Sequence, residues 1–378
     1  MNGLAVGRIL GFEIRIHLSW VLILALVAVV VVGQLELAAP DAEPAIRWLV
    51  GGLIAAAFLT SVLAHELGHG FVARRRGIRT GPITLYFFGG SALLDGEVER
   101  PGDEAAIAVA GPAVSLALGV VLCAGALVIP AGSGALVRAS AAVVLTLGVL
   151  NLVLGAINLV PGFPLDGGRL VRAFVWARTG DRGRGTRVAA TTGRVIGWAV
   201  VGGGLALLLN DEVTNGLLLG LSGWFLANAS RAVVRQQAVE DLLRAVTVGE
   251  AMERDVRSVP AQLTLDVFAE QLFAEDGMTT VPVVRNDEVV GLIGPAQLRS
   301  VGRGSWTTTR AEQLMVATAD VPPLRPEESV WSGLDRLRRS GLDGIPVVDS
   351  TGILGILTRR AVVRTIQTEA RDRGVAVP

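Results

Sequence analysis

The sequence predicts a polytopic α-helical membrane protein with about six transmembrane helices, a short membrane-associated β-hairpin and a soluble α/β region at the C-terminal end. Three observations support this fold class. Hydrophobic residues make up 51% of the 378 residues, and the mean hydropathy of +0.54 is too high for an ordinary soluble protein. Apolar runs long enough to cross a bilayer recur as far as Ala229. From Gln236 onward the composition becomes that of a soluble domain, and a sequence pattern repeats.

Charge and cysteine content exclude several other classes. The formal net charge is zero, so composition gives no sign of a nucleic-acid partner. The single cysteine, Cys123, excludes an intrachain disulfide and a zinc site built from cysteines. The first apolar stretch is too long for the core of a signal peptide, and no small-residue cleavage site follows it. We therefore expect it to be retained as a membrane span.

Charged connections between the apolar runs set the expected topology. Residues 34–44, before the second run, carry three acidic residues and no basic one, whereas Arg74, Arg75, Arg76 and Arg79 follow that run. By the positive-inside rule, the second span ends in the cytosol, and both termini of a six-span protein are cytosolic. We expect a multi-pass protein of a bacterial plasma membrane. The expected spans are residues 20–32, 48–72, 105–129, 139–159, 195–209 and 217–229.

A hairpin is expected after the second span. Residues 80–97 form short apolar runs interrupted by two glycines, which favours a hairpin over a helix. At membrane depth an open strand edge is tolerated only inside protein or beside a wet cavity. Such an edge can bind an unwound peptide as an additional strand, although a hairpin that only connects two spans remains the alternative. The residues that would receive the peptide are Phe87, Phe88, Gly89, Gly90 and Ser91.

The second span ends in the motif AHELGH, which contains two of the three histidines in the chain. On a helix His65 and His69 lie one turn apart on the same face, so both can bind one metal ion. Tetrahedral zinc suits such a pair, and Glu66 can contact a zinc-bound water without itself binding the metal. Glu66 is therefore the candidate general base. The motif also arises by chance on helices, but ionisable groups without partners are costly in an apolar span.

A second informative stretch, NLVPGFPLDGGR, follows the fourth span at residues 158–169. Its prolines and glycines interrupt the helix and leave Asp166 on irregular backbone, which at membrane depth usually lines a site. Two histidines need a third protein ligand to hold zinc with one position open, and Asp166 is the best candidate. Asn158 can donate a hydrogen bond to a substrate carbonyl or its oxyanion. A helix C-cap explains Asn158 equally well.

The soluble region contains two similar units. The pattern Pro282, Val283, Val284 and Gly291 recurs 64 residues later, each time with an amphipathic helix before it, at residues 265–275 and 328–339. Neither unit can bury its apolar face alone. The two units are therefore expected to stack as a pair.

Taken together, HELGH, the FFGG hairpin, AGP in the next span and NxxPxxPLDGGR resemble the site-2 protease family of intramembrane zinc metalloproteases. The doubled C-terminal unit resembles a pair of cystathionine-β-synthase (CBS) domains, which one branch of that family carries. The resemblance covers nearly the whole chain. It implies a membrane-embedded protease domain at residues 1–236, a first CBS domain at 237–302 and a second with a C-terminal helix at 303–378.

The resemblance also implies an activity. One Zn²⁺ per chain would be bound by His65, His69 and Asp166, and Glu66 would activate the attacking water. Asn158 matches a family asparagine that helps to position substrate. The family cuts membrane-spanning regulators, often anti-sigma factors or membrane-tethered transcription factors, within their transmembrane helix. The expected partners are thus a membrane-spanning protein substrate and the lipid bilayer.

Two departures from the family patterns bear on these expectations. Ser115 stands where the family usually has an asparagine after AGP, and we expect it to alter helix packing rather than chemistry. In nucleotide-binding CBS pairs a strand ends in glycine, two apolar residues and Ser or Thr, with an acid three residues later. The first repeat lacks both features, and the second keeps Thr358 but has Ala361 in place of the acid. An adenine nucleotide at the CBS pair and a homodimerisation or docking role therefore both remain open.

Two alternative functions also follow from the sequence. A membrane transporter gated by the CBS pair would show a polar path through the bundle and a repeat among the spans. Neither is visible, and the intramembrane acids are confined to the metal motif. A catalytically inactive relative that only binds membrane proteins remains open, although every catalytic residue is present.

Overall fold

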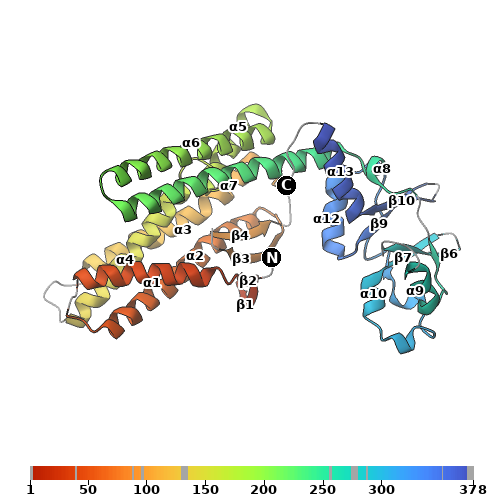
Figure 1. Ribbon diagram of the computed structural model, residues 1–378, viewed down its shortest axis with the longest axis horizontal. Coiled ribbons are helices and arrows are strands. Elements are labelled where there is room, and N and C mark those ends of the chain that lie inside the picture. The colour runs from red at the N-terminus through yellow and green to blue at the C-terminus, as the bar shows by residue number, and fades with distance from the viewer. Residues whose placement is uncertain are drawn as a thin grey trace. The chain divides into compact units, whose positions relative to one another are not determined.

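The computed structural model describes residues 3–38, 41–86, 89–94, 98–128, 135–254, 258–273, 280–286, 288–350 and 352–372. The chain divides into two compact units, Met1–Val234 and Arg235–Pro378. The division falls inside one helix, close to the boundary at residue 236 that the sequence suggested. Figure 1 labels the helices and strands of both units.

The first unit is mainly helical, as its composition predicts. Among the described residues, five helices are long and apolar enough to cross a membrane, and the apolar stretch Trp20–Glu36 is shorter. The sequence predicts about six spans, and the first of them, residues 20–32, lies in the shorter stretch. The helices are α1 (Trp20–Ala38), α2 (Pro44–Arg75), α3 (Pro101–Val128), α4 (Ala135–Asn158), α5 (Asp166–Thr179), α6 (Arg182–Leu209) and α7 (Val213–Ala245).

The expected hairpin forms part of a larger sheet. Strands β1 (Leu4–Ile9), β2 (Phe12–Ile16), β3 (Thr80–Tyr86) and β4 (Gly89–Leu94) lie in that order. The β1–β2 and β3–β4 pairs are antiparallel, whereas β2 and β3 are parallel, with Ile14 opposite Ile83. Strand β4 is therefore at one end of the sheet.

The sheet packs against α2, beside which it lies in Figure 1. Phe12, Ile14, Ile83 and Leu85 are buried in one cluster with Val62 of α2. Gly70 of α2 lies so close to the sheet that a Cβ there would meet the Phe12 ring at 2.8 Å. Because apolar burial contributes about 25 cal/mol per Å², this cluster fixes the sheet onto the helix that carries both motif histidines.

Helices α2, α3 and α5 form the framework around the motif residues. Helix α3 packs against α2, α4 and α5, and α5 packs in turn against α6. Helix α5 is short and carries Arg169, Arg172 and Arg178. It ends at Thr179, and the φ of 72° at Gly180 is the left-handed conformation of a helix C-cap.

The second unit contains both copies of the repeated pattern. The first copy comprises β5 (Val259–Pro260), α9 (Leu265–Phe273), β6 (Val281–Arg285) and β7 (Glu288–Ile293), followed by α10 (Pro295–Arg299), α11 (Ala311–Leu314) and β8 (Val316–Ala317). The second copy comprises α12 (Val330–Ser340), β9 (Gly344–Asp349), β10 (Gly352–Thr358) and α13 (Arg359–Asp372). The short helix α8 (Val248–Ala251) precedes both. Each copy therefore contains a helix followed by two strands, as expected.

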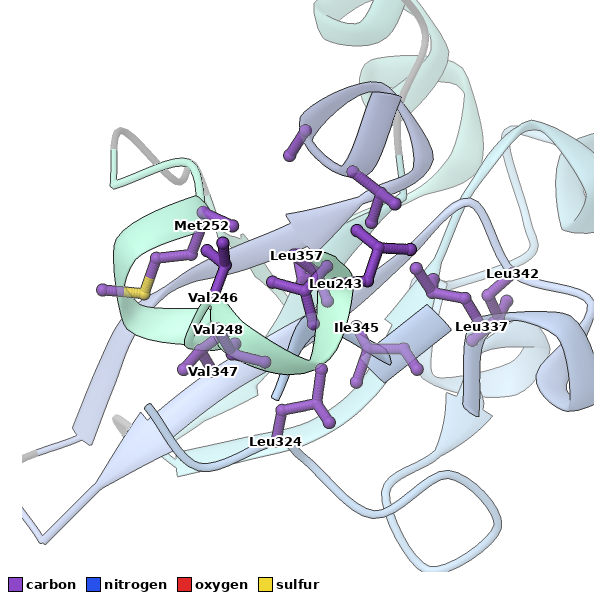
Figure 2. Packing of buried hydrophobic residues seen from close by; sticks show 14 of the residues in the cluster. Leu243, Val246, Val248, Met252, Leu324, Leu337, Leu342, Ile345, Val347 and Leu357 are labelled. Atoms are coloured by element: carbon purple, nitrogen blue, oxygen red, sulfur yellow. The ribbon is translucent and has the colours of Figure 1, made fainter. Parts of the chain in front are cut away.

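The core of the second copy includes residues that precede the first copy. Figure 2 shows Leu243, Val246 and Val248 in the same apolar cluster as Val347 and Leu357. Thr247 pairs with Ser329, and Glu253 pairs with Ile356, as isolated bridges. The segment after α7 thus belongs to the core of the second repeat, and the pair folds as one unit.

Candidate metal centre

Helix α2 places the two motif histidines on one buried face. His65 is 3% exposed and His69 is 5% exposed, and their ring centroids lie 4.9 Å apart with the rings nearly perpendicular. Their Nε2 atoms are 3.2 Å apart. The spacing of four residues on a helix produces this approach, as the sequence predicts.

Asp166, distant in sequence, meets both histidines. Its Oδ2 lies 3.2 Å from Nε2 of His65 and 3.2 Å from Nε2 of His69. Its side chain is 12% exposed. Among the described residues, these three are the group of His, Cys, Asp and Glu side chains whose ligand atoms converge closely enough to hold a metal ion.

The three ligand atoms fit zinc. They form a nearly equilateral triangle with sides of 3.2 Å, and ligands about 2.0–2.1 Å from a tetrahedral zinc ion lie about 3.3 Å from one another. Two imidazoles and one carboxylate are a common catalytic zinc set, and three protein ligands leave a fourth position open. His65, His69 and Asp166 are therefore suited to hold such an ion.

Helix α3 contacts the other nitrogen of each imidazole. The Nδ1–H of His69 donates to the backbone carbonyl of Ile107 at 2.7 Å, which leaves Nε2 with its lone pair for a metal. Nδ1 of His65 lies 2.9 Å from Oγ of Ser115, which is fully buried. Such contacts orient metal ligands and tune their basicity. The expectation that Ser115 affects only helix packing was therefore wrong, because its hydroxyl contacts a candidate ligand.

Gly111 of the AGP motif lies directly against the metal centre. A Cβ at this position would meet Nε2 of His69 at 2.2 Å and Nε2 of His65 at 2.6 Å. Both distances are far shorter than van der Waals contact. The absence of a side chain at Gly111 therefore leaves the space that the two candidate ligand atoms occupy.

The loop before α5 fixes the position of Asp166. Ser230 of α7 donates a hydrogen bond to the Phe163 carbonyl at 2.5 Å, and a Cβ on Gly193 of α6 would lie 2.3 Å from that oxygen. At the start of α5, a Cβ on Gly167 would lie 2.2 Å from the Val160 carbonyl. The glycine after Asp166 therefore lets the loop backbone pack tightly over the helix start.

Glu66 lies on α2 with the two histidines, and Asn158 ends α4, before the loop that leads to Asp166. Glu66 follows His65 in α2 and is 7% exposed, so the candidate general base is shielded from bulk solvent. Asn158 ends α4, and its amide donates to the Leu154 carbonyl at 3.0 Å. Asn151 makes the same contact with Leu147 in the middle of the helix, so this bond decides neither the C-cap nor the substrate role of Asn158.

The hairpin residues proposed for peptide binding are only partly described. Phe87 and Phe88 lie outside the described residues. Gly89, Gly90 and Ser91 lie in β4, where they pair with Tyr86, Leu85 and Thr84 of β3. Both β3 and β4 pack against α2. The terminal strand of the sheet is thus next to the helix of the metal motif.

In the CBS region the retained Thr358 already has protein partners. The Ala361 N–H donates to its hydroxyl at 3.0 Å, and the hydroxyl donates to Oε1 of Glu253 at 3.2 Å. Arg364 approaches the same carboxylate at 3.7 Å. A nucleotide that accepted a hydrogen bond from the Thr358 hydroxyl would first have to displace Glu253.

Comparisons with known proteins agree with this geometry. The family model described as peptidase family M50 matches residues 53–133 and 124–200. Together these matches include both motif histidines, Glu66, the AGP motif and Asp166. The CBS domain model matches residues 248–302 and 311–368.

Relatives named as zinc metalloproteases match almost the entire chain. Rip3 of Mycobacterium tuberculosis is 34% identical over 97% of this chain and 93% of its own. The protein sll0528 of Synechocystis is 30% identical over 98% of this chain and 97% of its own. The solved site-2 protease from Methanocaldococcus jannaschii covers 61% of this chain and 95% of its own, with 27% identity and a TM-score of 0.41. This chain belongs to peptidase family M50, the site-2 protease family of zinc metalloproteases, as a multi-pass membrane member with a C-terminal CBS pair.

Proposed function

We propose that His65, His69 and Asp166 hold the zinc ion of this metalloprotease and that Glu66 is its general base. The convergence of the three ligand atoms at 3.2 Å from one another carries the proposal. Asp166 is separated from the histidines by about a hundred positions of sequence. No local sequence pattern requires their side chains to meet.

A zinc ion bound there with one open position would lower the pKa of a coordinated water and polarise the scissile carbonyl. The chain's own groups do the rest. Glu66 takes a proton from the attacking water and delivers it to the leaving amine. The Ile107 carbonyl and the Ser115 hydroxyl hold the imidazoles in orientation. Burial of Glu66 and both histidines excludes competing bulk water.

The proposed substrates are membrane-anchored regulators of the anti-sigma or transcription-factor type, cut within or near a transmembrane segment. A helical substrate hides its amides in its own hydrogen bonds, so it must unwind before hydrolysis. Strand β4 ends the sheet and packs against α2. Among the described strands, none pairs with the outer edge of β4. This edge receives the unwound peptide as an additional strand, with Asn158 positioning the scissile segment.

The enzyme is proposed to lie in a bacterial plasma membrane with both termini cytosolic. Arg74, Arg75 and Arg76 at the end of α2, with Arg79 after it, support this orientation by the positive-inside rule. The metal centre, one to three turns before these arginines, then lies in the cytoplasmic half of the bilayer.

Substrate trapping tests the substrate class. We expect a full-length Glu66→Gln protein, purified gently from membranes, to retain an anchored regulator with a soluble domain on one side of a single membrane span. The control is the wild-type protein, which releases the cut product. Recovery of only soluble proteins, together with cleavage of soluble unfolded peptides by the wild type, would contradict this class.

We also propose that the CBS pair forms a homodimer. The Thr358 hydroxyl already bonds to protein groups, which disfavours a nucleotide role, and the two repeats belong to one compact unit that can act as one assembly module. Full-length protein should therefore contain two chains per particle by multi-angle light scattering, and a protein ending near Arg235 should contain one. The same number of chains in both would contradict the proposal.

A further inference from the structure

The first turn of α3 contains a fully buried carboxylate that the proposed reaction does not use. The Glu104 side chain is 0% exposed. Its Oε1 accepts a hydrogen bond from Nε of Arg172 at 2.9 Å and a second from Nη2 of the same guanidinium. Nε of Arg169 lies 3.8 Å from this oxygen. Both arginines belong to α5, the helix that begins with the candidate ligand Asp166.

Contacts at two points along α5 set its position. Asp166 begins the helix, Arg169 follows three residues later and Arg172 three residues after that, so these contacts extend over the first two turns of the helix. Asp166 contacts the histidines of α2, and the two arginines contact α3. The Arg172 guanidinium also lies 5.0 Å from the Phe163 ring, in the loop that leads into α5. Rotation or sliding of α5 would break the contact with Glu104 and move Asp166.

One face of α3 makes the contacts that hold the two imidazoles and helix α5. Glu104, Ile107, Gly111 and Ser115 recur at spacings of three and four residues, which places them on one side of the helix. Ile107 and Ser115 contact the imidazoles, and Gly111 leaves space for the ligand atoms. Glu104 contacts the helix that carries the carboxylate. Helix α3 therefore contacts both the helix of the two histidines, α2, and the helix of Asp166, α5.

Glu104 also has an electrostatic effect on the candidate metal site. Arg169 and Arg172 place two positive charges one and two turns from Asp166, close to the position of a divalent cation. In a poorly solvated interior, repulsion of that cation would be strong. Glu104 offsets part of this charge. Its other oxygen, Oε2, has no hydrogen-bond partner within the part of the chain that the structure describes.

We propose that Glu104 is a positioning residue for the metal centre. Through Arg172 it fixes the placement of Asp166, and through its negative charge it compensates the guanidinium groups beside the cation site. This proposal rests on the zinc site proposed above.

Replacing Glu104 by Gln keeps the volume and one acceptor but removes the charge. We expect Glu104→Gln to weaken Co²⁺ binding to the purified, metal-free full-length protein about 10-fold or more, a usual effect of losing support for a ligand. The measurement is competition with a chelator, at a temperature where the metal-free variant is folded. The cobalt absorption spectrum reports whether the tetrahedral geometry is retained. Wild-type affinity and spectrum in Glu104→Gln would overturn the proposal.

Asp103→Asn is the matched control. Asp103 is the preceding residue of α3, and it pairs at 2.7 Å with Arg76 rather than with α5. Its loss removes an ion pair at the same helix end without touching the helix of Asp166. Cobalt affinity should remain at the wild-type value. A loss equal to that of Glu104→Gln would overturn the proposal, because any ion pair at this helix end would then have the same effect.

A double-mutant cycle tests whether Glu104 acts through Arg172. Arg172→Gln should also weaken Co²⁺ binding, and the double variant should bind within about threefold of the weaker single variant, because coupled residues are not additive. Fully additive losses would overturn the proposal. Should Glu104→Gln fail to fold, Arg172→Gln alone tests the same link by affinity and spectrum. A wild-type protein that binds no Co²⁺ would instead contradict the metal centre itself.

Discussion

Replacing Glu66 by Gln should abolish proteolysis while leaving the metal in place. The amide has nearly the shape of the carboxylate but cannot take the proton of the attacking water, and a positioned general base contributes about 100- to 10,000-fold to rate. Glu66 is not among the three converging ligand groups, so the zinc content should stay near one per chain. Cleavage of a co-expressed transmembrane substrate and metal analysis of the same preparation measure the two effects.

Glu36→Gln is the control for this substitution. Glu36 lies at the end of α1 with its side chain 59% exposed, and it pairs loosely with Arg47 at 3.6 Å. The variant should cut at the wild-type rate. Continued cleavage by Glu66→Gln would refute the general-base assignment, and loss of zinc from that variant would mean that Glu66 also supports the metal.

Replacing Gly111 by Ala should disrupt the metal site without unfolding the helix. The added methyl would lie 2.2 Å from Nε2 of His69 and 2.6 Å from Nε2 of His65, so both rings would have to turn away. We expect zinc affinity to fall by about 100-fold, the upper end of what lost ligand orientation costs. Alanine favours the helix by about 1 kcal/mol, whereas displacing two buried rings costs about 1–3 kcal/mol. The metal-free variant should therefore remain folded and melt at or slightly below the temperature of the metal-free wild type.

The matched control is Gly125→Ala in the same helix. A Cβ at Gly125 meets no atom of the described residues within 4 Å, so this variant makes the same chemical change in open space. It should bind zinc and cut substrate as the wild type does. Equal zinc affinity in Gly111→Ala and Gly125→Ala would show that the space above Gly111 is not needed by the ligands.

The local part of the site was predictable from the sequence. The spacing of His65 and His69 on a helix determines that their rings share a face, and this follows from helix geometry alone. The prediction of Asp166 as a ligand required a chemical argument instead. A zinc ion with one open position needs a third protein ligand, and the proline- and glycine-rich stretch places a carboxylate at membrane depth. The structure brings all three together.

What the sequence could not supply depends on contacts between distant segments. The Ile107 contact uses a backbone carbonyl, which no residue type reveals. Ser115 was assigned to packing because its role depends on the rotation of α3 against α2. Strands β2 and β3 pair in parallel across two intervening helices, so no local pattern could join them into one sheet. The spacing of Glu104, Ile107, Gly111 and Ser115 was the one signal that could have identified the supporting face.

Zinc K-edge X-ray absorption on the purified full-length protein measures the ligands of the metal ion. We expect one zinc per chain with two imidazole nitrogens and a carboxylate oxygen at about 2.0–2.2 Å, and loss of that signal in Asp166→Ala. A zinc environment that is unchanged in Asp166→Ala, or one that contains a sulfur ligand from Cys123, would refute the assignment of His65, His69 and Asp166 as the zinc ligands.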